Sequence, residues 1–359
     1  MEKVLRLFIN LIRISIGESS VELPTLSVEQ WKELYTLARK QALTGVLSKA
    51  IESLPDEQRP PREVTLKWIV AAEQIKQNNS HLNQAAAKVR TFWEVNGFQN
   101  CILKGQGIAQ LYPNPELRVP GDIDIWINGK RKDIISLIRK HSKSSHAVYH
   151  HIDGLQIDGV EVETHFTPSF MNNPFANRRL QRWIAESASL QFSLETEVDG
   201  QYIHTPTLAF NRVFILHHIY RHFFYEGIGL RQMMDLYYVL KQGFTKNEQE
   251  ETIRIYNKLN LYKFARAAMY VLQEFFGLPK EFCIVPPDES YGRVLMSEII
   301  SGGNFGQAAI LKTRKETRIQ RGWRIIKRSL QFIKYEPLEV LWMPYFKIWN
   351  LVNYVRIYH

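Results

Sequence analysis

The stretch Gly121-Asp122-Ile123-Asp124-Ile125 decides the expected fold. Alternate residues of a β-strand point to the same side, so Asp122 and Asp124 are predicted to project together while Ile123 and Ile125 face the core. Two carboxylates placed in this way at the start of a strand can share divalent metal ions. An isolated Asp-x-Asp also occurs on the solvent-facing side of half-buried strands, so the neighbouring sequence has to decide between these interpretations.

A glycine-containing turn precedes this stretch at residues 103–107, whose sequence is Leu-Lys-Gly-Gln-Gly. It follows an apolar strand candidate at residues 101–104 and leads into a short predicted helix at residues 108–111. Glycines in such a turn let backbone amides approach a phosphate group, and a helix N-terminus favours the anion. Lys104 and Arg118 are candidate contacts for a triphosphate, although each also fits an ordinary surface charge.

A third carboxylate is available from a later strand candidate at residues 160–166. Its alternation places Glu161, Glu163 and His165 on one face. Either glutamate would complete a cluster of three acids with the two aspartates, and such a cluster is stable only where cations or water balance the charge. The turn before the aspartates and the acid-bearing strand after them favour a metal site over a solvated strand face.

Helical spacing dominates residues 1–95 and predicts an N-terminal helical region. An amphipathic helix rather than a signal peptide is expected over residues 1–17, because basic residues interrupt the apolar run and no cleavage site follows. Ser27 and Gln30 form a capping-box signature, and a long helix is predicted over residues 64–94.

Strand signals replace this pattern in the centre of the chain. Three Asp-Gly pairs, which begin at Asp153, Asp158 and Asp199, predict hairpin turns. One helix is expected at residues 130–141. We therefore predict an α+β (α/β) fold, in which a small mixed β-sheet core at residues 96–205 is flanked by N-terminal and C-terminal helical regions.

Helical spacing returns after the predicted core. Helices are expected over residues 208–225, 230–240 and 248–276. They belong to a predicted helical domain at residues 206–310 that closes the cleft, with a turn at residues 302–306. The last region, residues 311–359, is predicted to be a basic, aromatic helical tail that Pro337 and Pro344 interrupt.

The net charge of +10 is concentrated in this tail, because residues 311–359 hold eleven Lys or Arg and three Glu. A basic surface attracts the phosphates of nucleotides, nucleic acids or lipid headgroups, so RNA and an anionic membrane surface are candidate partners. A solvated helix packed on the domain by its aromatic residues fits the tail equally well. Only two cysteines occur, far apart, and no run of about 18 uncharged apolar residues is present. We therefore expect a cytoplasmic protein, with peripheral membrane contact through the tail as an option.

The ordered Lys-Gly turn, Arg-x-x-x-Asp-x-Asp and Glu-x-His motifs resemble the uncharacterised bacterial nucleotidyltransferase family within the polymerase-β superfamily. The resemblance covers residues 27–306, including residues 226–231 with Asp235 and the glycine-rich residues 302–306. It implies Asp122 and Asp124 as ligands of Mg²⁺ (or Mn²⁺), with Glu163 as the third acid because it lies two residues before His165. It also implies transfer of a nucleoside monophosphate from an NTP to an acceptor, which the sequence leaves open as a small molecule, a protein or an RNA.

Further residues receive roles from their place in these motifs. The expected nucleotide-binding residues are Lys104, Gly105, Gln106, Arg118 and Arg231. The expected residues of the substrate cleft are His165, His218, His222 and Asp235. Two local alternatives stay open, since His218 and His222 are spaced to chelate zinc and Arg231 is spaced to form an ion pair with Asp235 along one helix.

Gln106 departs from the pattern of the superfamily, in which Ser or Gly usually follows the first glycine of the turn. A serine hydroxyl at that position would contact a phosphate, and glutamine removes it. The departure keeps a second hypothesis open, in which the protein retains the fold and binds a ligand without turnover.

Overall fold

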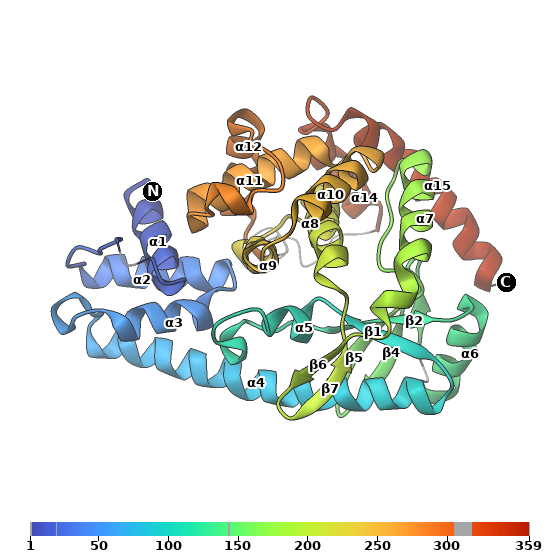
Figure 1. Ribbon diagram of the computed structural model, residues 1–359, viewed down its shortest axis with the longest axis horizontal. Helices are drawn as coiled ribbons and strands as arrows, with labels where there is room; N and C mark the ends of the chain where they lie inside the picture. The colour runs from blue at the N-terminus through green and yellow to red at the C-terminus, as the bar shows by residue number, and fades with distance from the viewer. Residues whose placement is uncertain (1, 19, 143, 305–317, 359) are drawn as a thin grey trace.

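The computed structural model describes residues 2–18, 20–142, 144–304 and 318–358 (Figure 1). It shows an α+β protein, as predicted, in which helices precede and follow a mixed five-stranded sheet. The N-terminal helices are α1 (Glu2–Ser15), α2 (Val28–Lys40), α3 (Thr44–Ser53) and α4 (Arg62–Val95), with the 3₁₀ turn η1 (Asp56–Gln58) before α4. Ser27 and Gln30 form the predicted capping box of α2, and α4 confirms the long helix.

Five strands form the central sheet. Their spatial order is β1 (Gln99–Leu103), β2 (Ile123–Asn128), β5 (Val160–His165), β4 (His151–Ile157) and β3 (His146–Ala147). β2 and β5 are parallel, and the other neighbours are antiparallel. Asp124 lies opposite Glu163 in the parallel pair, and Leu103 lies opposite Asp124 in the antiparallel pair. This register brings two of the predicted acids and the residue before Lys104 together on adjacent strands.

Alternation along β2 separates its apolar side chains from its acidic one. Three isoleucines lie in a buried cluster with α4 and α6 (Arg131–His141): Ile123, Ile125 and Ile127. Trp126 shares the face of Asp124 and packs on Phe210 of α8 (Leu208–Tyr225), with ring centroids 5.9 Å apart. Asp124 therefore projects toward the side covered by α8, which Figure 1 shows above the sheet while α4 lies below it.

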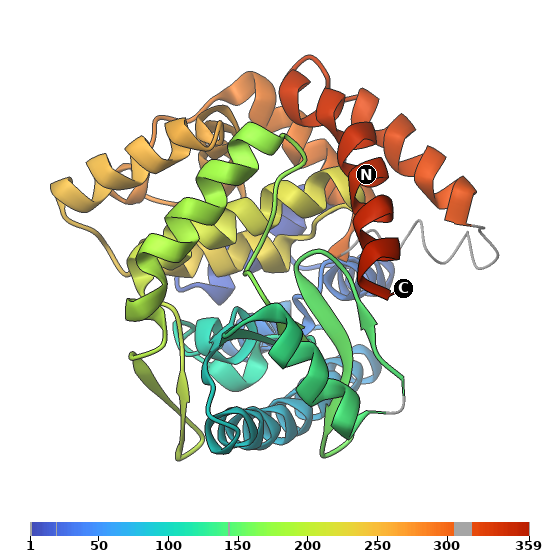
Figure 2. The ribbon, with the colours of Figure 1, turned by 90° about the vertical axis from the view of Figure 1, so that its right-hand side faces the viewer.

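Most helices that follow the sheet in the chain lie on the same side of it as α8 (Figures 1 and 2). Short elements are α5 (Gly105–Ala109), η2 (Pro115–Leu117), η3 (Lys280–Phe282) and the hairpin of β6 (Glu195–Val198) and β7 (Gln201–His204). Longer helices are α7 (Pro174–Gln191), α9 (Leu230–Lys241), α10 (Lys246–Lys258), α11 (Tyr262–Phe276), α12 (Glu289–Gly302), α14 (Arg318–Leu330) and α15 (Pro337–Tyr358). Within the described ranges, no helix combines the length and hydrophobicity needed to cross a lipid bilayer.

Helices from both ends of the chain share one large apolar cluster. It contains Phe8 of α1 and Trp31 of α2 together with Leu236 of α9 and Phe275 of α11. The N-terminal and C-terminal helices therefore share one core and stabilise each other. The boundaries of the four regions expected from the sequence stay a prediction.

Two of the three Asp-Gly pairs form the predicted hairpin turns. Residues 158–159 join β4 to β5 and residues 199–200 join β6 to β7, with positive φ throughout. The prediction was wrong for residues 153–154, because they form an irregularity inside β4, where the register with β5 shifts. A Cβ on Gly154 would lie 2.4 Å from the backbone oxygen of Ser144, so packing requires glycine at this bulge.

Two helical expectations also need correction, and one helix was not predicted. Residues 248–276 form α10 and α11 rather than one helix, because Asn260 adopts a positive φ of 59° between them. No helix was predicted at α7, whose N-cap Asn173 accepts two backbone hydrogen bonds. Pro344 lies inside α15, since proline can kink a long helix without ending it. The expected turn at residues 302–306 and the start of the tail extend outside the described residues.

The buried carboxylate of Glu336 makes the stability of the fold depend on pH. Tyr220 donates a hydrogen bond to it over 3.1 Å, and burial raises its pKa from 4.5 to about 8. Stability from a carboxyl group with a raised folded pKa is fully present below the unfolded pKa, and is lost as the pH rises through the folded pKa.

We therefore expect Glu336 to contribute a loss of about 2–3 kcal/mol of stability between about pH 5.5 and about pH 9, and Glu336→Gln to reduce the pH dependence by that amount. Burial raises the pKa of Glu339 to about 7, so Glu339 keeps a contribution of its own in the variant. Thermal unfolding at the two pH values measures it. Glu186→Gln, at an exposed position of α7, is the matched control. Equal pH dependence in wild type and Glu336→Gln would contradict the prediction.

Candidate active site

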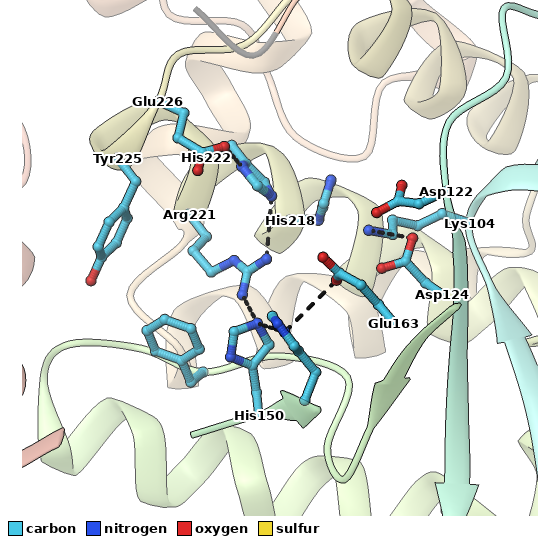
Figure 3. Close-up of a pocket in the computed structure, with 12 residues that line it drawn as sticks. Lys104, Asp122, Asp124, His150, Glu163, His218, Arg221, His222, Tyr225 and Glu226 are labelled. Atoms are coloured by element: carbon cyan, nitrogen blue, oxygen red, sulfur yellow. Dashed lines mark hydrogen bonds and ion pairs between the residues drawn. The ribbon is translucent and has the colours of Figure 1, made fainter. Parts of the chain in front are cut away.

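A pocket of about 350 Å³ lies between the acid-bearing strands and α8 (Figure 3). One side carries the predicted acids with Lys104, and the other side carries residues of α8. The lining residues are Lys104, Asp122, Asp124, His150, His151, Glu163, Phe170, His218, Arg221, His222, Tyr225 and Glu226. The tertiary structure thus brings all three predicted acids into one pocket.

Asp124 is the most constrained of the three acids. Its carboxylate is buried, and its Oδ2 lies 3.0 Å from the Lys104 ammonium. His165 Nε2 contacts the other oxygen, Oδ1, at 2.9 Å, and also lies 3.4 Å from Glu163 Oε2. One imidazole therefore bridges the carboxylates of two parallel strands and fixes their orientation.

The turn after β1 determines where Lys104 points. Lys104 has a φ of 54°, which is uncommon for a residue with a Cβ, and it is the last residue before α5. Such backbone conformations persist only where the surrounding structure holds them, and they are frequent at functional sites. The turn returns the Lys104 side chain to Asp124. Gly107 has a packing role, because a Cβ there would lie 2.6 Å from Thr205 Cγ2.

The three acids differ in their affinity for protons. Asp122 is exposed at the pocket, yet repulsion from Asp124, followed by desolvation in the pocket, raises its pKa to about 6. Burial alone would raise the pKa of Asp124, but Lys104 and His165 outweigh burial and hold it well below its usual range. Desolvation likewise opposes the ionised form of Glu163, while its hydrogen bond with His165 lowers the pKa overall. The acidic side thus holds more carboxylates than its one lysine neutralises.

This donor set fits a divalent cation. Mg²⁺ prefers oxygen ligands, and carboxylates in proteins supply them. The side-chain ligand atoms of Asp124, Glu163 and His165 all lie within 4.8 Å of one another. The pKa of Asp122 is raised by a neighbouring negative charge, which a bound cation would offset. The acidic side of the pocket is therefore the candidate metal centre.

The α8 side of the pocket contains residues that the sequence analysis missed. Arg221 Nη1 donates to His150 Nε2 over 2.7 Å, and Nη2 donates to His222 Nε2 over 3.2 Å. His222 Nδ1 contacts Glu226 Oε2 at 3.1 Å. Burial lowers the pKa of both imidazoles, so they accept the hydrogen bonds in their neutral form. Arg221 and His222 lie three and four residues after His218, and this helical spacing places them on the face of His218. The spacing was the signal in the sequence that could have identified Arg221.

Arg118 and Asp235 lie outside the pocket. Arg118 Nε and Nη2 donate to the two carboxylate oxygens of Asp235 over 2.7 and 2.8 Å, and Tyr112 donates to the same group over 2.7 Å. All three side chains are buried. Asp235 is therefore not a cleft residue, and the ion pair expected with Arg231 is replaced by one with Arg118.

Arg231 supports the loop that leads to Asp122. Its Nη1 donates to the backbone oxygens of Val119 and Pro120 over 3.0 and 3.1 Å. A Cβ on Gly121 would lie 3.6 Å from the same nitrogen, which shows how closely the guanidinium follows this loop. Arg231 is buried and does not line the pocket.

The other predicted residues divide between the pocket and its wall. His218 and His222 line the pocket, with ring centroids 4.3 Å apart. Burial, then the charge of Lys104, lowers the pKa of His218 well below its usual value. Gly105 and Gln106 are buried at the start of α5, next to Lys104, and do not line the pocket.

Comparison with known proteins assigns the chain to a family. Its sequence matches the family described as uncharacterised nucleotidyltransferase over residues 27–277, which contain the whole pocket. A solved antigenic nucleotidyltransferase-like protein from Paracoccidioides brasiliensis is 11% identical, and the match covers 59% of this chain and 96% of that protein with a TM-score of 0.37. No curated protein matches the sequence. Because the family match spans well over half of the 359 residues, the chain belongs to the uncharacterised nucleotidyltransferase family.

Proposed function

We propose that the protein transfers a nucleoside monophosphate from an NTP to an acceptor hydroxyl or phosphate. The observation that carries this proposal is the pairing of Asp124 with Glu163 on parallel strands, beside Asp122 and in one pocket. Nucleotidyl transfer requires oxygen ligands that hold divalent cations around a triphosphate. Membership of the family supports the same reaction class.

The residues on the acidic side of the pocket would have different roles in this reaction. Asp122, Asp124 and Glu163 would hold Mg²⁺ or Mn²⁺, and the bound metal would activate the attacking oxygen and neutralise the leaving pyrophosphate. His165 orients Asp124 and Glu163, and Lys104 brings a positive charge to the place where phosphate oxygens would approach. We assign Glu163 to metal binding because it lies opposite Asp124 in the parallel pair.

The remaining predicted nucleotide-binding residues would act through the walls of the pocket. Arg118 and Arg231 hold the loop that precedes Asp122. Arg118 pairs with Asp235, and Arg231 donates to the backbone oxygens of Val119 and Pro120. Gly105 and Gln106 would shape the wall behind Lys104.

Calorimetric titration of each NTP tests the proposal, with Mg²⁺ and with EDTA, on wild type and on the Asp122→Asn/Asp124→Asn double variant. We expect at least one NTP to bind only with metal, and the double variant to lose that binding. The NTP identified in this way then enters an acceptor screen over small alcohols, proteins and RNA ends, with pyrophosphate release as the readout. Absence of NTP binding in wild type would overturn the proposal. It would favour the alternative suggested by Gln106, in which the protein keeps the fold and binds a ligand without turnover.

The outer face of α15 supports a second proposal, on where the protein acts. Six large apolar side chains are exposed at helical spacing on α15: Leu338, Leu341, Tyr345, Ile348, Trp349 and Val352. The buried side chains of α15 occupy the opposite face: Val340, Met343 and Phe346. The same C-terminal region exposes Lys327 and Lys334, whereas Glu336 and Glu339 are buried.

We propose that this outer face contacts an anionic membrane surface. An apolar stripe with basic residues nearby is typical of helices that lie in the bilayer interface, and exposed Trp and Tyr favour the headgroup region. RNA would bind the basic residues but would leave the aliphatic stripe in water. The composition of the described face therefore favours lipid over RNA.

Ile348→Glu should weaken binding to vesicles that contain anionic lipid by about tenfold, because a charge in the stripe opposes burial in the interface. Co-sedimentation with anionic and neutral vesicles measures the change. Leu66→Glu is the matched control, since Leu66 is an exposed leucine of α4. Vesicle binding that Ile348→Glu leaves unchanged, or binding of RNA in its place, would count against the proposal.

A further inference from the structure

Arg221 is a partly buried cation on the α8 side of the pocket (Figure 3). Its hydrogen bonds go to two imidazoles, those of His150 and His222, and its guanidinium carbon lies 5.1 Å from the ring centre of Phe170. Over the described part of the chain, it forms no ion pair with a carboxylate. The positive charge of Arg221 is therefore held in place without a carboxylate in direct contact, although Glu163 and Glu226 of the same pocket attract it.

A partly buried guanidinium without a direct counter-ion requires an explanation, because removing a cation from water without pairing it is costly. Neutral imidazoles orient Arg221 but leave its charge in place. A guanidinium has five N–H donors in a planar fork, and the two hydrogen bonds to histidine leave donors for a ligand. The fork geometry matches the oxygens of phosphate better than a single ammonium group does.

The two sides of the pocket carry complementary charges. Figure 3 shows the three acids with Lys104 on one side, and Arg221 with His150 and His222 on the other. His222 is itself held by Glu226 at 3.1 Å, so the α8 side is an organised set of side chains. A substrate that reaches both sides would bring one phosphate to the candidate metal centre and a second anionic group to Arg221.

We propose that Arg221, oriented by His150 and His222, is a subsite for a phosphate group other than the one attacked at the candidate metal centre. The inference rests on the proposed function, because the phosphate belongs either to the terminal part of the NTP or to a phosphorylated acceptor. Both sources present the same chemistry to the guanidinium, and experiment distinguishes them.

Two titrations on wild type and Arg221→Gln separate the sources. The first uses tripolyphosphate with Mg²⁺, and the second uses inorganic phosphate on protein saturated with a non-cleavable α,β-substituted NTP analogue. We expect Arg221→Gln to weaken one of them by about ten- to a hundredfold, as expected for lost hydrogen bonds to a charged group. Loss in the first assigns the subsite to the donor triphosphate, and loss only in the second assigns it to the acceptor.

Matched variants make the result specific. Arg328→Gln is the control, because Arg328 bonds to the Phe223 carbonyl of α8 from outside the pocket. Arg221→Lys keeps the charge but not the fork, so it should also weaken the affected titration, and it replaces Arg221→Gln if that variant does not fold. Unchanged affinity in both titrations would overturn the inference.

The outcome also separates this inference from the proposed function. Metal-dependent NTP binding with no effect of either Arg221 variant would remove the subsite and leave the proposed function standing. If no NTP binds to wild type, inorganic phosphate is titrated into the free protein. Phosphate binding that depends on Arg221 there would retain the subsite and reject the proposed function, and its absence would reject both.

Discussion

Replacement of Asp124 by asparagine is expected to reduce nucleotidyl transfer by about a thousandfold or more, with the fold intact. Asparagine keeps the size of the side chain and a hydrogen-bond acceptor for His165, but it loses the charge that pairs with Lys104 and would bind metal. The loss should therefore appear in kcat and in metal affinity. Pyrophosphate release with the acceptor from the screen measures the first, and calorimetric titration of Mg²⁺ measures the second.

Two variants of β5 control this experiment. Glu163→Gln should resemble Asp124→Asn, because the two carboxylates lie opposite each other in the parallel pair and share His165. Glu161→Gln should retain activity, since Glu161 lies on the same strand but is exposed and does not line the pocket. Full activity of Asp124→Asn would contradict a catalytic role for the candidate metal centre.

Asp235→Ala is expected to destabilise the fold by about 3–5 kcal/mol, the range for a buried ion pair that loses one partner. The change leaves the buried guanidinium of Arg118 and the hydroxyl of Tyr112 without their common acceptor. Urea unfolding followed by circular dichroism measures the free energy of unfolding. Because Arg118 begins the loop that leads to Asp122, the affinity for Mg²⁺ should also fall.

The double variant Arg118→Met/Asp235→Leu provides the internal control. Removing both charges avoids an unpaired buried ion, so much of the stability lost in Asp235→Ala should return. Metal affinity should stay low, because the loop before Asp122 has still lost its anchor. A loss below about 1 kcal/mol in Asp235→Ala would place the pair among weak surface ion pairs and contradict this account.

Local signals in the sequence were sufficient to predict several structural elements. Ser27 and Gln30 predicted the start of α2 because a capping box involves only neighbouring residues. Residues 158–159 predicted a hairpin turn, since Asp-Gly readily adopts positive φ. A β-bulge can use the same backbone preference as a hairpin turn. At residues 153–154 the close contact with Ser144 decided for the bulge.

Tertiary contacts decided the roles that local patterns left ambiguous. Arg231 and Asp235 are four residues apart on α9, which favoured a local ion pair, but Asp235 binds Arg118, 117 residues earlier in the chain. Arg221 enters the pocket through a contact with His150, 71 residues away. Helical spacing alone does not show which face of a buried helix meets an active site, because every face of α8 is largely apolar or covered.

The sequence by itself determined that Asp122 and Asp124 lie at the start of a strand and that Glu163 and His165 share a face of another, because strand alternation is a local property. Only the tertiary structure decided that Asp124 pairs with Glu163, that His165 contacts Asp124, 41 residues earlier in the chain, and that Arg221 lines the same pocket. The physical reason is that parallel pairing and helix packing join distant segments, and the preferences of neighbouring residues carry no information about such contacts.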